Sequence, residues 1–329
     1  MSKVLIYVPK ELSLGGLRQL LSLLSVRQNR GAKITLFANR SILEKVPTEI
    51  GLVETGPLWI LKEIRISFLS KSYDELICFS NLPTLFSSYC NQVVFLQNRY
   101  LLGKSIINGL GLKLYFKFFA QRLFLRLFIR NSDILVQTPT MAFHVHKIGV
   151  PYKRIKILSK SLLFPNFNDP RHKVSELTFF YPASDDPHKN VILLIEAWKL
   201  LESGNVKAKL VVTLSRSQLN LGTAACCDPT FNVEFLGKIT ERAVESRIKS
   251  ADFLVFPSLF ESFGYSLYDA VKMGTPIICS ESSYVYDVCS PKMTFDPRCV
   301  FSIARTVARA AGQENIFMEQ VFNNVKEFN

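Results

Sequence analysis

The sequence predicts an α/β protein made of two doubly wound domains, each a parallel sheet with helices on both faces. Its 329 residues are enough for two buried cores. Apolar residues make up 48% and charged residues 20%, a composition that excludes a disordered chain. Short apolar runs of strand length alternate with helical segments along the chain, which is the pattern of βαβ units.

The first half begins with an expected strand at Val4–Val8, a turn containing Gly15 and Gly16, and a helix over about Leu17–Asn29. The turn lacks the G-x-G-x-x-G spacing of a dinucleotide site. Further strands are expected at 34–37, 75–79, 93–96, 133–138 and 155–158. Parallel sheets bind ligands at the carboxyl ends of their strands, so the loops that follow these strands are candidates to bind a ligand.

Asn98 and Arg99, which follow the strand at 93–96, are candidates for this ligand-binding edge, together with Gly15 and Gly16. The alternative for Arg99 is a solvated surface arginine.

The segment 110–130 has an unusual composition, with six aromatic residues, five Lys or Arg and no acid. Arg122, Arg126 and Arg130 recur every four residues and should form one helical stripe. Basic stems combined with aromatic rings suit a helix that lies on an anionic membrane surface. The alternative is a helix packed between the sheet and its neighbours, with its arginines directed outward.

The second half repeats the alternation of strands and helices. Strands are expected at 177–181, 209–213, 233–236, 253–256 and 277–279. Helices are expected at 189–201, 241–250, 266–272, 301–311 and 315–328. The Pro- and Asn-rich stretch 165–170 is the best linker, which gives domains at 1–165 and 166–312 and a terminal helix at 313–329.

A ligand site is expected where the strand 253–256 ends. Glu261 lies in a glycine-containing turn, and Asp269 follows eight residues later on a helix. The backbone amides at the start of that helix, at Phe263, Gly264 and Tyr265, can hold a phosphate between the two acids. This arrangement suits a sugar nucleotide, and the alternative is a helix N-terminus flanked by favourable acids. Lys189 is a cation at a predicted helix N-terminus, where a bound anion would explain it.

The stretches FPSLFESFGYSLYDA, GTPIICS and FFYPASDDPHKN resemble the carboxyl-domain signature of the family-4 glycosyltransferases. Those enzymes are retaining and have the GT-B fold, with two Rossmann-like domains facing a central cleft and a terminal helix that commonly crosses back to the first domain. The resemblance implies that Glu261 and Lys189 are catalytic. The donor-binding residues that it implies are Ser184, Gly237, Lys238, Ser262, Phe263, Gly264, Tyr265 and Asp269.

The sequence departs from the family pattern at three places. Asp269 replaces a second glutamate, Ser184 stands near a usual arginine, and Gln97 or Asn98 replaces a usual histidine. An inactive sugar-binding or scaffold protein of the same fold therefore stays open, as does a sugar-nucleotide epimerase. The resemblance implies a nucleotide-sugar donor, a saccharide or lipid-linked saccharide acceptor in bacterial surface-polysaccharide synthesis, and no cofactor or metal.

The net charge and the cysteine content indicate what the protein binds and where in the cell it is found. The net charge is +13, and residues 1–162 hold 23 Lys and Arg against 8 Asp and Glu. This asymmetry predicts a polyanionic partner for the first half. An anionic membrane is favoured over nucleic acid, because the aromatics lie in a Phe-rich helix and not on a stacking sheet. Seven cysteines without a C-x-x-C pair, and no apolar run of spanning length, suggest a cytoplasmic protein. The resemblance, together with the basic, Phe-rich first half, implies that it lies on the inner face of the plasma membrane.

Overall fold

The computed structural model describes residues 2–12, 14–47, 49–56, 58–86, 88–103, 112–129, 132–158, 177–219 and 232–326. The chain divides into a first unit, residues 1–160, and a second unit, residues 161–329. The predicted boundary at 165 and the linker at 165–170 lie outside the described residues.

The first unit is built on a seven-stranded parallel sheet in the order β3-β2-β1-β4-β5-β6-β7. Its strands are β1 Lys3–Val8, β2 Lys33–Ala38, β3 Gly51–Glu54, β4 Glu75–Cys78, β5 Asn91–Phe95, β6 Asp133–Val136 and β7 Ile155–Ile157. All six strands expected in this half are present. The strand β3 was not expected, because this short edge strand is mostly exposed and lacks an apolar run.

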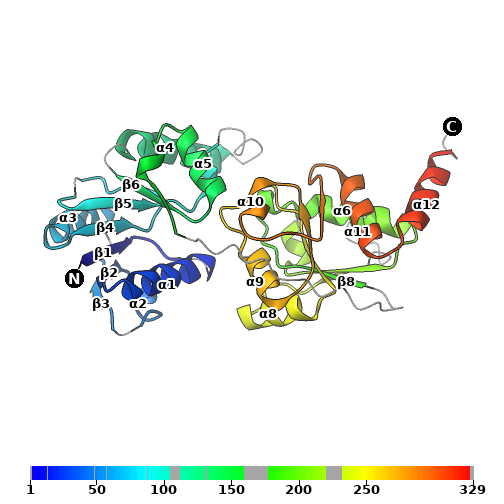
Figure 1. Ribbon diagram of the computed structural model, residues 1–329, viewed down its shortest axis with the longest axis horizontal. Coiled ribbons are helices and arrows are strands. Elements are labelled where there is room, and N and C mark those ends of the chain that lie inside the picture. The colour runs from blue at the N-terminus through cyan, green and yellow to red at the C-terminus, as the bar shows by residue number, and fades with distance from the viewer. Residues whose placement is uncertain are drawn as a thin grey trace. The chain divides into compact units, whose positions relative to one another are not determined.

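Helices cover both faces of this sheet. They are α1 Leu14–Asn29, α2 Arg40–Leu43, α3 Trp59–Leu69, α4 Leu112–Phe128 and α5 Pro139–Lys147. Successive residues of β1 alternate between two cores, as strand geometry requires. Leu5 and Tyr7 join the core beneath α3, α4 and α5, whereas Ile6 joins the core beneath α1 and α2. Figure 1 shows α1 and α2 on one side of the sheet and α4 and α5 on the other.

The start of α1 differs from the prediction. The helix begins at Leu14, so Gly15 and Gly16 lie within its first turn and not in a turn before it. Helical hydrogen bonding has therefore overridden the low helix propensity of glycine at these two positions.

The second unit contains a six-stranded parallel sheet in the order β10-β9-β8-β11-β12-β13. Its strands are β8 Leu177–Tyr181, β9 Ala208–Val212, β10 Val233–Phe235, β11 Phe253–Phe256, β12 Ile277–Ser280 and β13 Met293–Phe295. Its helices are α6 Val191–Ser203, α8 Glu241–Ser250, α9 Tyr265–Met273, α10 Ser283–Tyr286, α11 Val300–Ala310 and α12 Glu314–Lys326. The terminal helix α12 packs against α6 and α11 of the same unit, and its predicted crossing to the first domain stays a prediction.

In each sheet the order in which the chain adds strands reverses once. The strand order turns between β1 and β4 in the first sheet and between β8 and β11 in the second. The loops at such a switch point run to opposite sides and leave a crevice at the carboxyl ends of the strands, where open α/β sheets bind ligands. Both doubly wound parallel sheets of the predicted fold class are therefore present, each with a switch point of its own.

Candidate functional site

The candidate site lies at the switch point of the second sheet. Lys189 follows β8 and Glu261 follows β11, and the Lys189 Nζ donates a hydrogen bond to Glu261 Oε1 at 2.6 Å. Their side chains are only 19% and 12% exposed. Lys189 belongs to a 3-10 turn, Pro187–Lys189, and not to the helix that follows. The expectation of a cation on a helix N-terminus is thus corrected, and the neighbouring anion is a carboxylate of the protein itself.

Buried hydrogen bonds hold the two loops of this ion pair together. The Tyr181 hydroxyl donates to the backbone oxygen of Lys189 at 2.9 Å and lies 3.0 Å from Ser258 Oγ. Asn190 adopts a left-handed conformation with φ 58°, and its Nδ2 donates to the backbone oxygens of Pro257 and Pro297. Burial raises the pKa of Tyr181 well above its usual value, so this hydroxyl stays a donor. These hydrogen bonds therefore fix the two loops that carry Lys189 and Glu261.

His188 lies beside the ion pair but is itself uncharged at neutral pH. Its Nε2 is 3.9 Å from the Glu261 Oε1, and its ring stacks on Phe260 with the centroids 5.0 Å apart. Burial lowers the pKa of His188, and the Lys189 cation lowers it further, against the opposing effect of Glu261. The imidazole is consequently neutral at pH 7, and Lys189 is the cation next to Glu261.

The helix α9 begins immediately after the Glu261 loop. Gly264 precedes it with φ 84°, a left-handed conformation that favours glycine, and its backbone oxygen accepts a hydrogen bond from the Leu267 nitrogen. This places Phe263, Gly264 and Tyr265 at the positive end of the helix dipole, as expected. The expected boundaries of the helix, at residue 266 and before Gly274, are confirmed to within one residue.

The other predicted donor residues lie in loops at the same edge of the sheet or on α9. Ser184 follows β8, and its Oγ donates to Asp186 Oδ2 at 2.7 Å. Gly237 follows β10 with φ 66°, and Lys238 beside it is exposed. Ser262 directly follows Glu261, whereas Asp269 lies within α9 and is only 6% exposed. The donor contact expected of Asp269 stays a prediction.

In the first unit, Asn98 and Arg99 shape the loop after β5. The Asn98 side chain accepts a hydrogen bond from the Tyr100 nitrogen at 2.9 Å, and so caps a short 3-10 turn. An Arg99 Nη lies 2.5 Å from His144 Nε2. Burial lowers the pKa of Arg99 to about 10, and burial with the Arg99 charge lowers that of His144 to about 4. Arg99 is therefore not the solvated surface residue of the alternative interpretation.

The predicted arginine stripe of α4 is not uniform. Arg122 donates hydrogen bonds to the backbone oxygens of Tyr100 and Gly103, so it holds the loop after β5. Arg126 is exposed, and Arg130 lies outside the described residues. Phe118 and Leu125 of α4 join the core of the first unit, while most of the other side chains of the helix are exposed.

Sequence reasoning missed the residues that support the ion pair. Tyr181 ends one strongly apolar strand and Ser258 closely follows another, and that position was their only signal, whereas Asn190 lies in the turn before α6. It also missed α3, whose exposed apolar residues give no amphipathic pattern.

Residues 165–309 match the family model of the glycosyl transferases group 1. This match covers most of the second unit, and the chain has the GT-B fold. An uncharacterized glycosyltransferase of Methanocaldococcus jannaschii is 30% identical over 145 residues, which are 42% of this chain and 36% of that protein. The aligned part thus spans about a third of this curated relative.

Two solved structures support the GT-B fold. Anabaena HepE, crystallised with UDP and glucose, has a TM-score of 0.67 at 13% identity, covering 97% of this chain and 95% of that chain. WaaG, a glycosyltransferase involved in lipopolysaccharide biosynthesis, has a TM-score of 0.65 at 15% identity, covering 97% and 93%. At identities this low, the similarity to these two structures shows only the fold of this chain.

No helix in the described parts of the chain has both the length and the apolar character needed to cross a membrane. No group of three His, Cys, Asp or Glu side chains could hold a metal ion in the same residues.

Proposed function

We propose that this protein is a retaining glycosyltransferase of the family-4 type. Its second unit would bind a nucleotide-sugar donor, and its first unit would bind the acceptor. The observation that carries this proposal is the Lys189–Glu261 ion pair at the switch point, next to the N-terminus of α9. This pair lies inside the region that matches the glycosyl transferases group 1.

The ion pair suggests how donor binding prepares the site. The diphosphate of a donor competes with Glu261 for the Lys189 ammonium, and a phosphate offers more acceptor oxygens than one carboxylate. Transfer of Lys189 to the diphosphate would release Glu261 to accept hydrogen bonds from hydroxyls of the donor sugar. The ion pair of the free protein would then be exchanged for two separate contacts with the substrate.

The same two residues then supply charge in the transition state. The bond from the anomeric carbon to the phosphate oxygen breaks, and its electron pair leaves with the diphosphate. Lys189 and the positive end of α9 stabilise that negative charge, while Glu261 offsets the positive charge on the sugar. The acceptor hydroxyl attacks the face from which the diphosphate leaves and gives its proton to the departing phosphate oxygen, so that the configuration is retained. We propose that no metal or cofactor takes part, and transfer should accordingly persist in EDTA.

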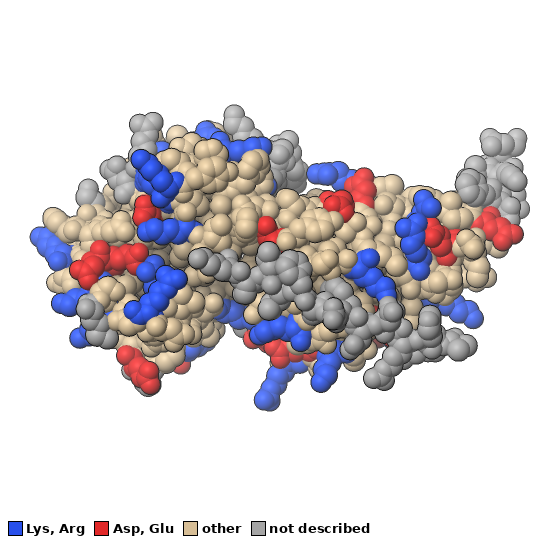
Figure 2. Space-filling view, viewed as in Figure 1, with Lys and Arg blue, Asp and Glu red and all other residues tan. Residues whose placement is uncertain are grey.

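We further propose that the acceptor is a lipid-linked saccharide used in bacterial surface-polysaccharide synthesis, O-antigen among them. Support comes from the similarity to WaaG, whose stated role is lipopolysaccharide biosynthesis. Further support comes from the exposed side chains of α4, among them Phe116, Phe119 and Leu127. Such a surface suits peripheral binding to the inner face of the plasma membrane. Figure 2 shows Lys and Arg side chains, with fewer Asp and Glu, separated by wide areas without charged residues.

The test compares Glu261→Gln with Glu196→Gln. Glu196 is a matched control because it also pairs with a lysine, Lys199, at 2.9 Å in the same unit, but on the helix α6. Glu261→Gln should lower sugar transfer by about a hundredfold or more while nucleoside diphosphate binding persists. Glu196→Gln should leave transfer unchanged. Full transfer by Glu261→Gln would refute the assignment, and a parent protein that binds nucleotide sugars without turnover would be an inactive sugar-binding protein.

A further inference from the structure

The first unit contains a pocket of about 290 Å³ at the switch point of its own sheet. Its lining comes from the ends of β1 and β4 and from the helices α3 and α4, which all belong to this unit. Pro9 and Lys10 follow β1, and Ser80 and Leu82 follow β4. The pocket thus occupies the position in the first sheet that the Lys189–Glu261 pair occupies in the second.

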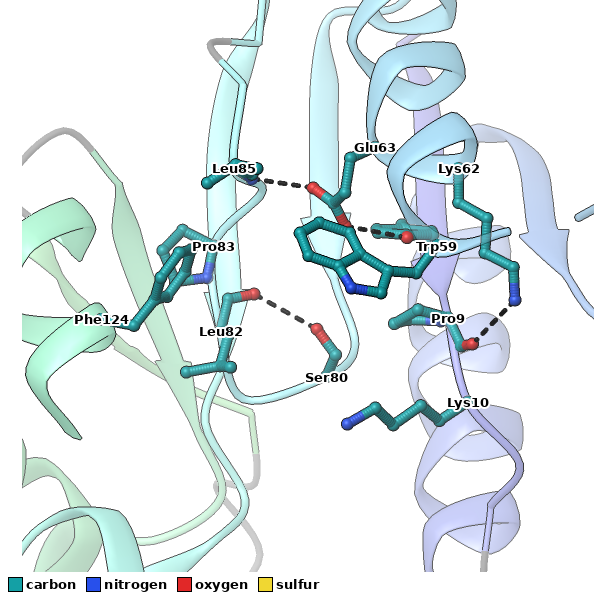
Figure 3. Close-up of a pocket in the computed structure, with 11 residues that line it drawn as sticks. Pro9, Lys10, Trp59, Lys62, Glu63, Ser80, Leu82, Pro83, Leu85 and Phe124 are labelled. Atoms are coloured by element: carbon teal, nitrogen blue, oxygen red, sulfur yellow. Dashed lines mark hydrogen bonds between the residues drawn. The ribbon is translucent and has the colours of Figure 1, made fainter. Parts of the chain in front are cut away.

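The walls of this pocket are apolar on both sides. Figure 3 shows Leu82, Pro83 and Phe124 on one side and Trp59 with Pro9 on the other. The Trp59 side chain is 61% exposed, although an indole ring normally favours burial. Leu58, directly before α3, is exposed as well, as are Ile60, Leu61, Ile64 and Phe68 on α3. The pocket itself could take a hydrocarbon group between its apolar walls.

The polar groups that line the pocket differ in whether they already have partners within the protein. Both oxygens of Glu63 already accept hydrogen bonds, one from the Tyr7 hydroxyl at 2.9 Å and one from the Leu85 nitrogen at 2.8 Å. Lys62 and Lys10, in contrast, form no ion pair with any described residue, and the Lys62 Nζ makes only a long hydrogen bond, 3.5 Å, to the Pro9 oxygen among these residues. In Figure 3 the Lys10 ammonium extends beneath the indole of Trp59. The charge that this pocket offers to a ligand is thus positive.

We propose that this pocket binds the phosphate and the adjoining hydrocarbon of a lipid-linked acceptor. Apolar walls suit the hydrocarbon chain, and two unpaired ammonium groups suit a phosphate or diphosphate. A free sugar fits less well, because it carries neither a negative charge nor a hydrocarbon chain. This inference rests on the proposed function, which it deepens by giving the acceptor a site and a chemical class: a phosphate ester on a hydrocarbon carrier.

Trp59 is a natural reporter for this binding. The chain has two tryptophans, and the other, Trp198, is only 2% exposed in the second unit. Addition of farnesyl diphosphate should shift the tryptophan emission of the full-length protein to shorter wavelength, and Trp59→Phe should abolish this shift. The double variant Lys10→Gln/Lys62→Gln should weaken the binding by about tenfold or more, since each lysine is expected to form charge-assisted hydrogen bonds. The control Lys33→Gln/Lys153→Gln, which removes two exposed lysines of the same unit, should bind like the parent.

Three further ligands test whether the pocket recognises a lipid-linked phosphate or another ligand with one of its parts. Farnesol and inorganic pyrophosphate should each bind much more weakly than farnesyl diphosphate, and equal binding of either would overturn the proposal. Tighter binding of dihexanoyl phosphatidic acid would assign the pocket to a phospholipid and overturn the acceptor assignment. Nucleoside diphosphate binding should be unchanged in the double lysine variant. Sugar transfer without farnesyl diphosphate binding would refute the pocket alone, whereas farnesyl diphosphate binding without transfer would refute the proposed function alone.

Discussion

At the scale of single residues, the central feature is a lysine and a glutamate that neutralise each other in the absence of substrate. A mostly buried ion pair contributes little net stability, because desolvation opposes the attraction between the charges. Removal of one partner leaves the other unpaired in a site of low exposure. The Lys189–Glu261 pair is therefore better explained by exchange with a ligand than by stabilisation of the fold.

The first residue prediction concerns Lys189→Ala. Loss of the ammonium should weaken nucleoside diphosphate binding by roughly 1.5 to 3 kcal/mol, the usual contribution of a hydrogen bond to a charged group. Calorimetry of Lys189→Ala beside Lys199→Ala measures this, because Lys199 pairs with Glu196 away from the site. Unchanged affinity in Lys189→Ala would show that the lysine only balances Glu261.

The second residue prediction concerns the pH dependence of folding. The pKa of His144 is lowered from 6.5 to about 4, mainly by burial and then by the Arg99 charge. Between these two pH values the unfolded chain binds a proton that the folded chain does not. The free energy of unfolding should therefore fall as the pH drops from about 6.5 towards 4.

Denaturant unfolding of the parent and of His144→Gln across this pH range tests the sign. The variant should lose stability less steeply as the pH falls. An NMR titration of Arg99→Gln should show the pKa of His144 raised from that of the parent, though not fully restored, because burial persists. Parallel stability curves for the parent and His144→Gln would contradict the expectation.

At the scale of helices and strands, the sequence was most informative where a strand is buried on both faces. The runs at 177–181 and 253–256 were predicted with the observed bounds, since both strands are central in their sheet. The edge strand β3 and the helix α3 were missed, because each is largely exposed and the hydrophobic pattern that marks buried elements is absent.

The same limit applies to the candidate site. The place of Glu261 after a buried strand and before a glycine turn follows from local pattern. Its contact with Lys189, seventy-two residues away in the chain, depends on the pairing of β8 with β11. No local signal carries that pairing, nor the hydrogen bonds of Tyr181 and Asn190 that hold the two loops together.

A prediction at this scale concerns the glycine that precedes α9. Gly264 has φ 84°, and a Cβ there would lie 3.1 Å from Leu267 Cδ1. Gly312 has φ 69° with no atom within 4 Å of such a Cβ, which makes Gly312→Ala a matched control. Both alanines should lose about 1 kcal/mol through the left-handed conformation. Gly264→Ala should lose more, since Leu267 must also move, and should weaken nucleoside diphosphate binding. Equal urea midpoints for the two variants would show that Leu267 adapts without cost.

At the scale of the whole molecule, the distribution of charge separates two kinds of partner. Residues 1–162 contain 23 Lys and Arg against 8 Asp and Glu, and the rest contains 17 against 19. The excess lies in the unit with the exposed apolar side chains of α3 and α4. Positive charge beside exposed apolar residues favours an anionic lipid surface, since charge attracts the protein and the apolar side chains then insert.

The last prediction tests this surface with residues that can be removed without disturbing the fold. Arg122 is unsuitable, because it holds the backbone oxygens of Tyr100 and Gly103. Lys113, Lys117 and Arg126 are exposed on α4, so the triple change to Gln should leave the helix intact. Each basic residue near an anionic surface contributes about 1 kcal/mol, so the triple variant should bind anionic vesicles roughly a hundredfold more weakly.

The matched control is Lys238→Gln/Arg247→Gln/Lys249→Gln, which removes the same charge from exposed positions of the second unit. Sedimentation with anionic vesicles at low salt should retain the control and the parent but release most of the α4 variant. Rising salt should release the parent as well, because exposed charges are screened beyond about 10 Å at 0.1 M. Equal loss in both triple variants would mean that net charge alone governs binding, and no loss in either would remove α4 from the membrane contact.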